Sequence, residues 1–449
     1  MYLLGWLAKK SHMATKASAA VVREASPATP TKGRYVAVAY GMTLSFITFL
    51  DRAAIGQAAP LIRRDLGLTA IEMGYVFSAF GLAYALLEIP AGIYCDRKGP
   101  RKALTQIVMW WSLFTVATGW AWNFTSMWAT RMLFGAGEAG CYPSLARLFR
   151  TWLPVRERPV AEGLKAASAR LGAAVAPSLV VFLYTFMSWK SVFLVLGLIG
   201  FAWVSAFYWW FRDTPSQHPS VNAAELAMIP VADQDHNHAP APWQDYMVSP
   251  SLWMLCLQWF CHFYGFYFYI TWLPTYLQEA RGVEVTRSAV LAGFPLLMAA
   301  LGSLAGGWAT SSLIRRFDIR RARKMVCYVS YAGAAVLMVL AIRADSVMTA
   351  IVLMSLSSFS VELSVPASWT TAMDLGGRHV GAVSGAMNTI GQLGGVVAPA
   401  VVGFVAQGGR QSWSAALYTA AVVYAIGFLC WLFLDPVTPL GRRSDETSL

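Results

Sequence analysis

Charged side chains are scarce in this chain of 449 residues. Asp, Glu, Lys and Arg make up 13% of it and hydrophobic residues 57%, whereas an ordinary soluble domain carries roughly a quarter charged residues. A single water-soluble core cannot absorb that excess of apolar side chains. Apolar blocks long enough to cross about 30 Å of hydrocarbon as helices instead predict an integral membrane protein.

The sequence also lacks the short motifs of metal and covalent chemistry. Its six cysteines show no Cys-x-x-Cys or Cys/His metal spacing, which favours free buried thiols. It contains no His-Glu-x-x-His zinc helix, no Gly-x-Ser-x-Gly elbow and no phosphate-binding loop. His236 and His238 lie in a polar loop, where solvated spacers are much commoner than metal ligands. A membrane-embedded enzyme is therefore disfavoured, and we expect no catalytic residues, no metal and no cofactor.

The net charge of +12 does not indicate nucleic-acid binding, because Lys and Arg lie in short turns between apolar blocks and form no continuous basic face. The positions of such turns indicate how the chain is oriented in the membrane, since loops rich in Lys and Arg stay on the cytoplasmic side. Basic residues gather in the N-terminal tail and in the turns after the second, fourth and eighth blocks. With an even number of spans, both termini are expected in the cytoplasm.

Twelve apolar blocks are recognisable, six on each side of a polar interval. They are residues 35–57, 72–95, 103–122, 126–149, 160–187 and 191–211, then 251–277, 288–313, 325–342, 347–372, 380–405 and 414–434.

This pattern predicts an all-α membrane protein with two six-helix bundles around a central cavity. The expected divisions are a disordered cytoplasmic tail (1–34), a first bundle (35–211), a cytoplasmic linker (212–250), a second bundle (251–434) and a second cytoplasmic tail (435–449). The first residues look like a fragment of a signal peptide, but the apolar run is too short. No cleavage is expected, and Met13 is an alternative start.

Five ionisable residues within the predicted spans are candidates for function, because charge inside a membrane is costly. They are Asp51, Arg52, Arg131, Glu138 and Arg170. Burial pushes Asp51 and Glu138 toward the neutral form and nearby arginines push them back, so both acids are predicted to exchange protons. The planar arginine side chain binds both oxygens of a carboxylate, so Arg52, Arg131 and Arg170 are predicted to hold an organic anion. The alternative is that these charges form internal ion pairs that merely pack the bundle.

A loop after the second block resembles the G-x-x-x-D-R-x-G-x-R/K motif of the major facilitator superfamily. The matching residues are Gly92, Asp96, Arg97, Gly99 and Arg101, which the resemblance implies take part in gating. The corresponding loop of the second half is degenerate, with Ser311 where aspartate would match, so a gating ion pair there is in doubt.

Finer matches resemble the anion:cation symporter family within that superfamily, over nearly all of residues 34–436. They are Asp51-Arg52, the run from Arg131 to Gly140, the run from Thr271 to Leu277, and Gly385-Ala386-Met387-Asn388. The resemblance implies transport of an organic anion coupled to a cation, usually a proton, across a bacterial inner (plasma) membrane. It also places a pocket tyrosine at Tyr84.

Other polar side chains of the spans are weaker candidates for substrate binding. Tyr267 lies in the aromatic seventh span, and Ser368, Asn388 and Gln392 lie in the tenth and eleventh. Hydrogen bonds between helices are an equally good use of the last three.

The leading hypothesis is therefore proton-coupled import of a small carboxylate, with rocking of the two bundles around a midplane site. Sugar acids, hexuronates, dicarboxylates and aromatic acids all fit. Protons are preferred to Na⁺ as the coupling ion, the lipid bilayer is the surrounding partner, no nucleic acid is involved, and a monomer is expected. An exporter or antiporter of organic ions is the runner-up, and a nutrient sensor without transport is a third reading.

Overall fold

A computed structural model describes residues 29–229, 241–406 and 412–440. The start-site alternative at Met13, the histidines His236 and His238, and most of both predicted tails lie outside these residues.

Among the described residues, the first half contains seven helices. They are α2 (Gly33–Leu66), α3 (Ala70–Lys98), α4 (Pro100–Gly119), α5 (Phe124–Glu138), α6 (Cys141–Trp152), α7 (Arg158–Tyr184) and α8 (Trp189–Trp210). Local sequence sets their starts, since Thr69 and Glu72 form a capping box before α3, and Asn123 and Ser126 form another before α5. Both boxes satisfy backbone N–H groups that a helix start leaves unpaired.

The second half follows a short connecting region. That region holds the 3₁₀ turn η1 (Pro215–Gln217), α9 (Ala223–Leu226) and α10 (Trp243–Met247). The second half then consists of α11 (Pro250–Thr271), α12 (Leu273–Glu279), α13 (Val285–Ile314), α14 (Ile319–Arg343), α15 (Val347–Glu362), α16 (Val365–Gly376), the turn η2 (Gly377–His379), α17 (Val380–Ala406) and α18 (Ser412–Phe433).

Each of the twelve predicted blocks is occupied by one helix or by two helices joined at a break. The predicted end of the first block at residue 57 was wrong, because α2 continues to Leu66. The fourth span of each half is broken, after Glu138 in the first half and after Glu362 in the second. Seven segments of the described chain are long and apolar enough to cross a membrane on those two properties alone; α5, with 15 residues, falls short because of its break.

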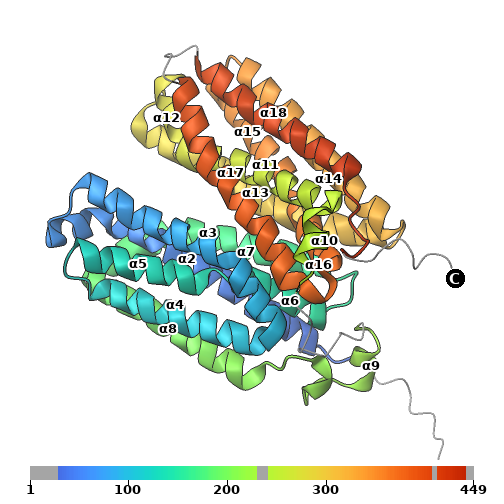
Figure 1. Ribbon diagram of the computed structural model, residues 1–449. Helices are drawn as coiled ribbons and strands as arrows, with labels where there is room; N and C mark the ends of the chain where they lie inside the picture. Colours follow the sequence, from blue (N-terminus) through green and yellow to red (C-terminus); the bar gives the residue numbers. More distant parts are fainter. Residues whose placement is uncertain (1–28, 230–240, 407–411, 441–449) are drawn as a thin grey trace, which may run out of the picture.

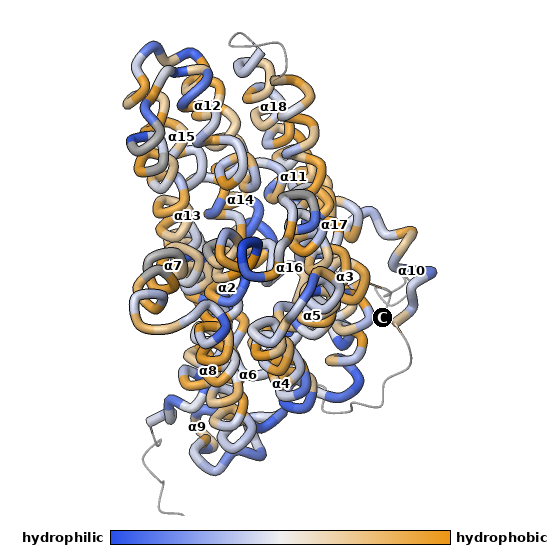
Figure 2. Tube along the Cα trace, turned by 90° about the vertical axis from the view of Figure 1, so that its left-hand side faces the viewer, coloured by the Kyte–Doolittle hydropathy of each residue, from blue (hydrophilic) through white to orange (hydrophobic). Residues whose placement is uncertain are grey.

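The two halves meet at the end of the molecule where α2 begins and α18 ends, which we call the tail-side end (Figure 1). There α3 packs against α17 and α7 against α13 and α16. Toward the opposite end the helices of the two halves diverge in Figure 1. Hydrophobic residues cover most of the helices in Figure 2, with hydrophilic ones mainly at their ends and connections, as a bilayer requires.

Part of the connecting region is packed against the first bundle. The Glu225 carboxylate of α9 accepts hydrogen bonds from the backbone N–H groups of Gly33 and Arg34 and pairs with the Arg34 guanidinium at 3.1 Å. These contacts satisfy the first turn of α2, so α9 is anchored to the start of the first bundle.

Candidate functional site

Three helices of the first half bring the predicted charges together. Asp51 and Arg52 lie on α2, Tyr84 on α3, and Arg131 and Glu138 on α5. Arg52 Nε donates to Glu138 Oε1 at 2.6 Å, and its guanidinium lies 4.7 Å from the Tyr84 ring centroid. Arg52 is therefore paired with Glu138 and not with its sequence neighbour Asp51.

Arg131 differs from the other two arginines in having no ion-paired acid among the described residues. Its residue is 2% exposed, its guanidinium lies 4.2 Å from the Phe134 ring centroid, and no ion pair of the described residues includes it. Its Nε also has no hydrogen-bond partner within the described chain. Glu138 and Asp51 act on Arg131 only through space. A buried cation without a bonded counter-ion is costly, so Arg131 is a natural position for an anion.

Asp51 is the corresponding free acid. It is 2% exposed, and neither carboxylate oxygen has a hydrogen-bond partner among the described residues. It interacts electrostatically with Arg131 and Glu138 without touching either. A buried carboxyl group with no bonded partner can accept or release a proton without breaking a contact.

A second network connects the two halves through Glu88 on α3. Glu88 Oε1 accepts from the Tyr84 hydroxyl at 3.2 Å and from Asn388 Nδ2 at 2.5 Å. Asn388 Oδ1 in turn accepts from Trp259 Nε1 at 3.0 Å. Two residues predicted to bind solute, Tyr84 and Asn388, are therefore engaged by Glu88, which was not among the predicted site residues.

Arg170 is engaged by the second half. Its Nη2 donates to Glu362 Oε1 at 2.7 Å, and the guanidinium lies 3.7 Å from the Phe266 ring centroid. The same carboxylate accepts from Ser303 at 2.7 Å and lies 3.7 Å from His262 Nε2. The partner of Arg170 is therefore an acid of the other half and not Glu138. Both Arg52 and Arg170 keep part of their side chains exposed, 16% and 15%.

The two paired acids hold equivalent places in the internal repeat. Glu138 ends α5 and Glu362 ends α15, and each helix is the first part of a broken fourth span. An acid at the C-terminal end of a helix is repelled by the helix dipole, so an arginine partner stabilises each one. The repeat thus places an arginine-paired glutamate in each half, and both arginines, Arg52 and Arg170, come from the first half.

The three remaining candidates have different surroundings. Ser368 is fully buried and donates to Ser364 O and Gln258 Oε1. The bond to Gln258 joins two helices, so Ser368 serves helix packing. Tyr267 donates to Gln392 Oε1 at 3.5 Å, and both residues are half-buried. Ser368 is enclosed within the second half, whereas Tyr267 and Gln392 remain partly accessible.

The motif loop lies at the junction of the halves. Asp96 accepts hydrogen bonds from the backbone N–H groups of Gly381 and Ala382, at 2.8 and 2.9 Å, in the first turn of α17. Its carboxylate also lies 3.5 Å from Arg147 Nη1. Asp96 therefore binds the N-terminus of a helix in the other half, where an acid is favoured.

The other motif residues support this loop from the first half. Gly99 has φ 79°, which a residue with a side chain rarely adopts. The backbone N–H of Arg101 donates to Asp213 Oδ1 at 2.8 Å, and Arg97 is exposed.

The second-half loop makes a different contact. Ser311 Oγ donates to Arg156 O at 2.7 Å, so a hydroxyl and a carbonyl join the halves there. Nearby, Asp374 bridges Arg158 of the first half, at 3.2 Å, and Arg323 of the second, at 2.6 Å. Burial lowers the pKa of Arg158 to about 10.

Several charged residues at the junction of the halves were missed in the sequence reading. They are Glu162, Lys165 and Asp374. Glu162 and Lys165 lie inside the predicted block 160–187, so their charge within an apolar span was a signal. Asp374 follows the tenth block and could not be told from an ordinary loop acid.

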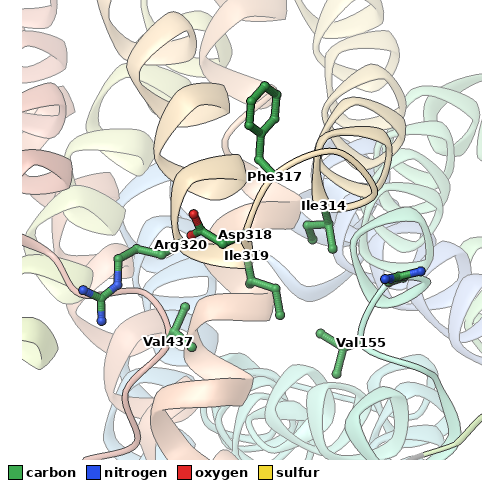
Figure 3. A pocket seen from close by; sticks show the side chains of 8 residues that line it. Val155, Ile314, Phe317, Asp318, Ile319, Arg320 and Val437 are labelled. Atoms are coloured by element: carbon green, nitrogen blue, oxygen red, sulfur yellow. The ribbon is translucent and has the colours of Figure 1, made fainter.

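A pocket of about 550 Å³ lies at the tail-side end, away from the charged cluster (Figure 3). It is lined by Val155, Arg156, Ile314, Phe317, Asp318, Ile319, Arg320 and Val437. Its lining contains none of the predicted substrate or proton residues, so it is separate from the candidate site.

Comparison with known proteins decides the family. The sequence pattern of the Major Facilitator Superfamily matches residues 41–399. The chain belongs to this superfamily. The matching region includes all five intramembrane charges and the motif loop.

Curated relatives in this superfamily are named as carriers of acids. A probable sulfoacetate transporter of Cupriavidus necator is 33% identical over 420 residues, covering 92% of this chain and 97% of that protein. A probable galactarate/D-glucarate transporter of Escherichia coli is 29% identical, covering 89% and 94%. A hexuronate transporter of Bacillus subtilis is 28% identical, covering 89% and 95%.

These relatives confirm the resemblance to anion:cation symporters and the prediction of a carrier and not an enzyme. Among solved structures, the major facilitator FucP in the outward conformation matches with a TM-score of 0.71 and 17% identity, covering 90% of this chain and 99% of that one. It shows the same fold.

Replacing Gly92 by Ala should hold the tail-side end apart. A Cβ at position 92 would lie 2.1 Å from Gly381 O, and overpacking costs about 1–3 kcal/mol. That cost lowers the population of the state closed at this end, so we expect the rate of uphill transport to fall roughly 5-fold or more. Gly81→Ala on the same helix is the control, because a Cβ there meets nothing within 4 Å. Equal transport by both variants would show that closure at Gly92 is dispensable.

Proposed function

We propose that this carrier imports a small organic anion together with protons by alternating access. The observation that supports the proposal is Arg131, a buried cation that forms no ion pair among the described residues, whereas Arg52 and Arg170 each have one. The missing counter-ion is supplied by the carboxylate or sulfonate group of the substrate. Arginine suits this role because its fork binds two oxygens and stays charged in a pocket.

Asp51 and Glu138 are proposed as the proton-coupling pair. When the substrate anion occupies Arg131, it adds negative charge beside both acids and favours their protonation. After the carrier reorients, loss of those protons restores the negative charge and helps expel the anion. Glu138 would then be released from and recaptured by Arg52, whereas Asp51 has no bond to break.

The tail-side end is proposed to face the cytoplasm, with the linker 212–250 and both tails on that side. The turns rich in Lys and Arg support this orientation. The state described here is then closed to the cytoplasm by Asp96, Arg158 and Asp374. The domain divisions drawn from the sequence, a bacterial inner membrane and a monomeric state belong to the same proposal.

An exporter or antiporter of organic ions is the second candidate, since the same charges serve either direction. Reversal of the substrate and pH gradients in vesicles separates it from an importer.

A thermal-shift panel on the purified carrier tests anion recognition directly. Sulfoacetate, D-glucarate, a hexuronate and phthalate are compared with uncharged sugars of similar size. The proposal predicts a rise in melting temperature with at least one acid and none with the sugars. Stabilisation by the sugars alone would overturn it.

The Arg170–Glu362 pair is proposed to select for a second acidic group on the substrate. Glu362→Gln should free Arg170 and tighten the binding of dianions such as sulfoacetate or D-glucarate, whereas Arg170→Gln should weaken it. We expect about ten-fold changes in opposite directions, as for a charge-assisted hydrogen bond. Hexuronates, with one carboxylate, are the control ligands and should change much less.

Titration calorimetry of both variants measures these affinities. Equal effects on dianions and hexuronates would show that the pair only joins the halves.

A further inference from the structure

One buried ion pair on α7 belongs to neither arginine–glutamate cluster. Lys165 Nζ pairs with the Glu162 carboxylate one turn earlier, and their side chains are 2% and 0% exposed. Within the described chain, the Lys165 ammonium group donates no further hydrogen bond and the Glu162 carboxylate accepts none. A buried pair with so few supporting contacts is a poor way to stabilise a fold, which suggests another use.

Aromatic side chains pack against this ammonium group, and one of them belongs to the second half. Lys165 Nζ lies 4.0 Å from the Trp369 ring centroid on α16 and 5.4 Å from the Tyr142 ring centroid on α6. The two rings lie 6.1 Å apart. Trp369 belongs to the second half, so the junction of the halves is what hides the charge.

Lys165 also lies on the route between the tail-side closure and the central charges. Arg158, at the start of α7, pairs with Asp374 of α16. Lys165 is about 10 Å further along the helix axis, and Arg170 about 7 Å beyond it. The order along α7 is therefore closure, Lys165, central site.

Opening of the tail-side end uncovers the side of Lys165 that Trp369 covers, whereas the rings of Tyr142 and Phe149 belong to the same half and stay beside it. When the halves rock apart there, Asp374 leaves Arg158 and Trp369 moves away with its own half. Glu162 stays with Lys165, because both are on α7. The ammonium group then faces the opened space with one acidic neighbour.

We propose that Lys165 is an anion-binding residue of the tail-side route, which receives the substrate's carboxylate or sulfonate group after Arg131 releases it. Glu162 neutralises this lysine while Trp369 covers it. A flexible ammonium group is suited to a brief contact of this kind, since it does not demand a fixed geometry. The inference rests on the proposed anion transport.

A purely structural pair predicts the opposite sign of effect. If Lys165 and Glu162 only hold the tail-side end shut, their removal populates the open form and strengthens apparent binding from that side. If Lys165 binds the anion, their removal weakens binding from that side.

The test is sulfoacetate exchange in membrane vesicles of both orientations, with D-glucarate if the wild-type carrier exchanges only that acid. The double variant Glu162→Gln/Lys165→Met leaves no lone buried charge. We expect its KM at the tail-side face to rise about five-fold or more, and its KM at the other face to change less than about two-fold. Glu162→Gln alone should lower the tail-side KM, because it removes the competing anion.

Arg320→Gln is the control at the same end, since it removes an exposed ion pair with Asp435. Binding from the opposite face confirms that each variant is folded. Three results in the double variant would overturn the tail-side site but not the proposed function. They are a lowered tail-side KM, an equal change in KM at both faces, and no change in KM. No exchange by the wild-type carrier would overturn the proposed function, and this site with it.

Discussion

Replacing Arg131 by Ala should abolish anion binding while leaving a folded, inserted carrier. The change removes a buried cation that forms no ion pair among the described residues, so it breaks none of the printed contacts of Arg52 and Arg170. Loss of one partner of a buried charge pair costs about 2–5 kcal/mol, which is roughly a 30-fold or larger loss of affinity. Titration calorimetry with sulfoacetate and D-glucarate measures it.

Two companion variants identify the cause. Arg131→Lys should restore binding only in part, because the charge returns without the two-pronged geometry. Arg64→Ala removes an exposed arginine of the same half, 77% exposed at its side chain, and should leave the affinity unchanged. Near wild-type affinity in Arg131→Ala would rule out its proposed role.

Asp51→Asn should separate substrate exchange from proton-driven accumulation. The variant mimics a permanently protonated acid, and no hydrogen bond of the described residues is lost with it. Exchange of labelled substrate across vesicles should persist, whereas accumulation driven by an imposed pH gradient should fall to equilibrium. Glu138→Gln should uncouple in the same way, with an added change in affinity because Arg52 loses its partner.

Glu279→Gln is the matched control for these acids, since Glu279 is exposed at the end of α12. It should accumulate substrate like the wild type. If Asp51→Asn and Glu138→Gln both still concentrate substrate against its gradient, the coupling role of these acids is wrong.

Most of the architecture could be predicted because membrane spans are long and their apolar signal is strong. The breaks in the fourth span of each half gave no such signal, since Gly140 and the stretch around Leu363 lie within continuous apolar blocks. The end of α2 was misplaced for a related reason. Its last turns carry Arg63, Arg64 and Asp65, and charge ends an apolar block without ending a helix.

The candidate site could be predicted from the sequence where a rare kind of residue marked it. A charge inside a span is costly, and this principle found Asp51, Arg131 and Glu138. Pairing between distant helices could not be read in the same way. Sequence spacing does not predict the Arg170–Glu362 ion pair or the hydrogen bond between Asn388 and Glu88, because each joins helices from different halves.

Counterflow in proteoliposomes tests the central claim most directly. Vesicles that contain only the purified carrier are loaded with unlabelled sulfoacetate, D-glucarate or a hexuronate and diluted into a trace of the same labelled acid. The account predicts transient uptake of label for at least one acid, with none in Arg131→Ala vesicles. No uptake of any of these acids by the wild type, or equal uptake by Arg131→Ala, would contradict it.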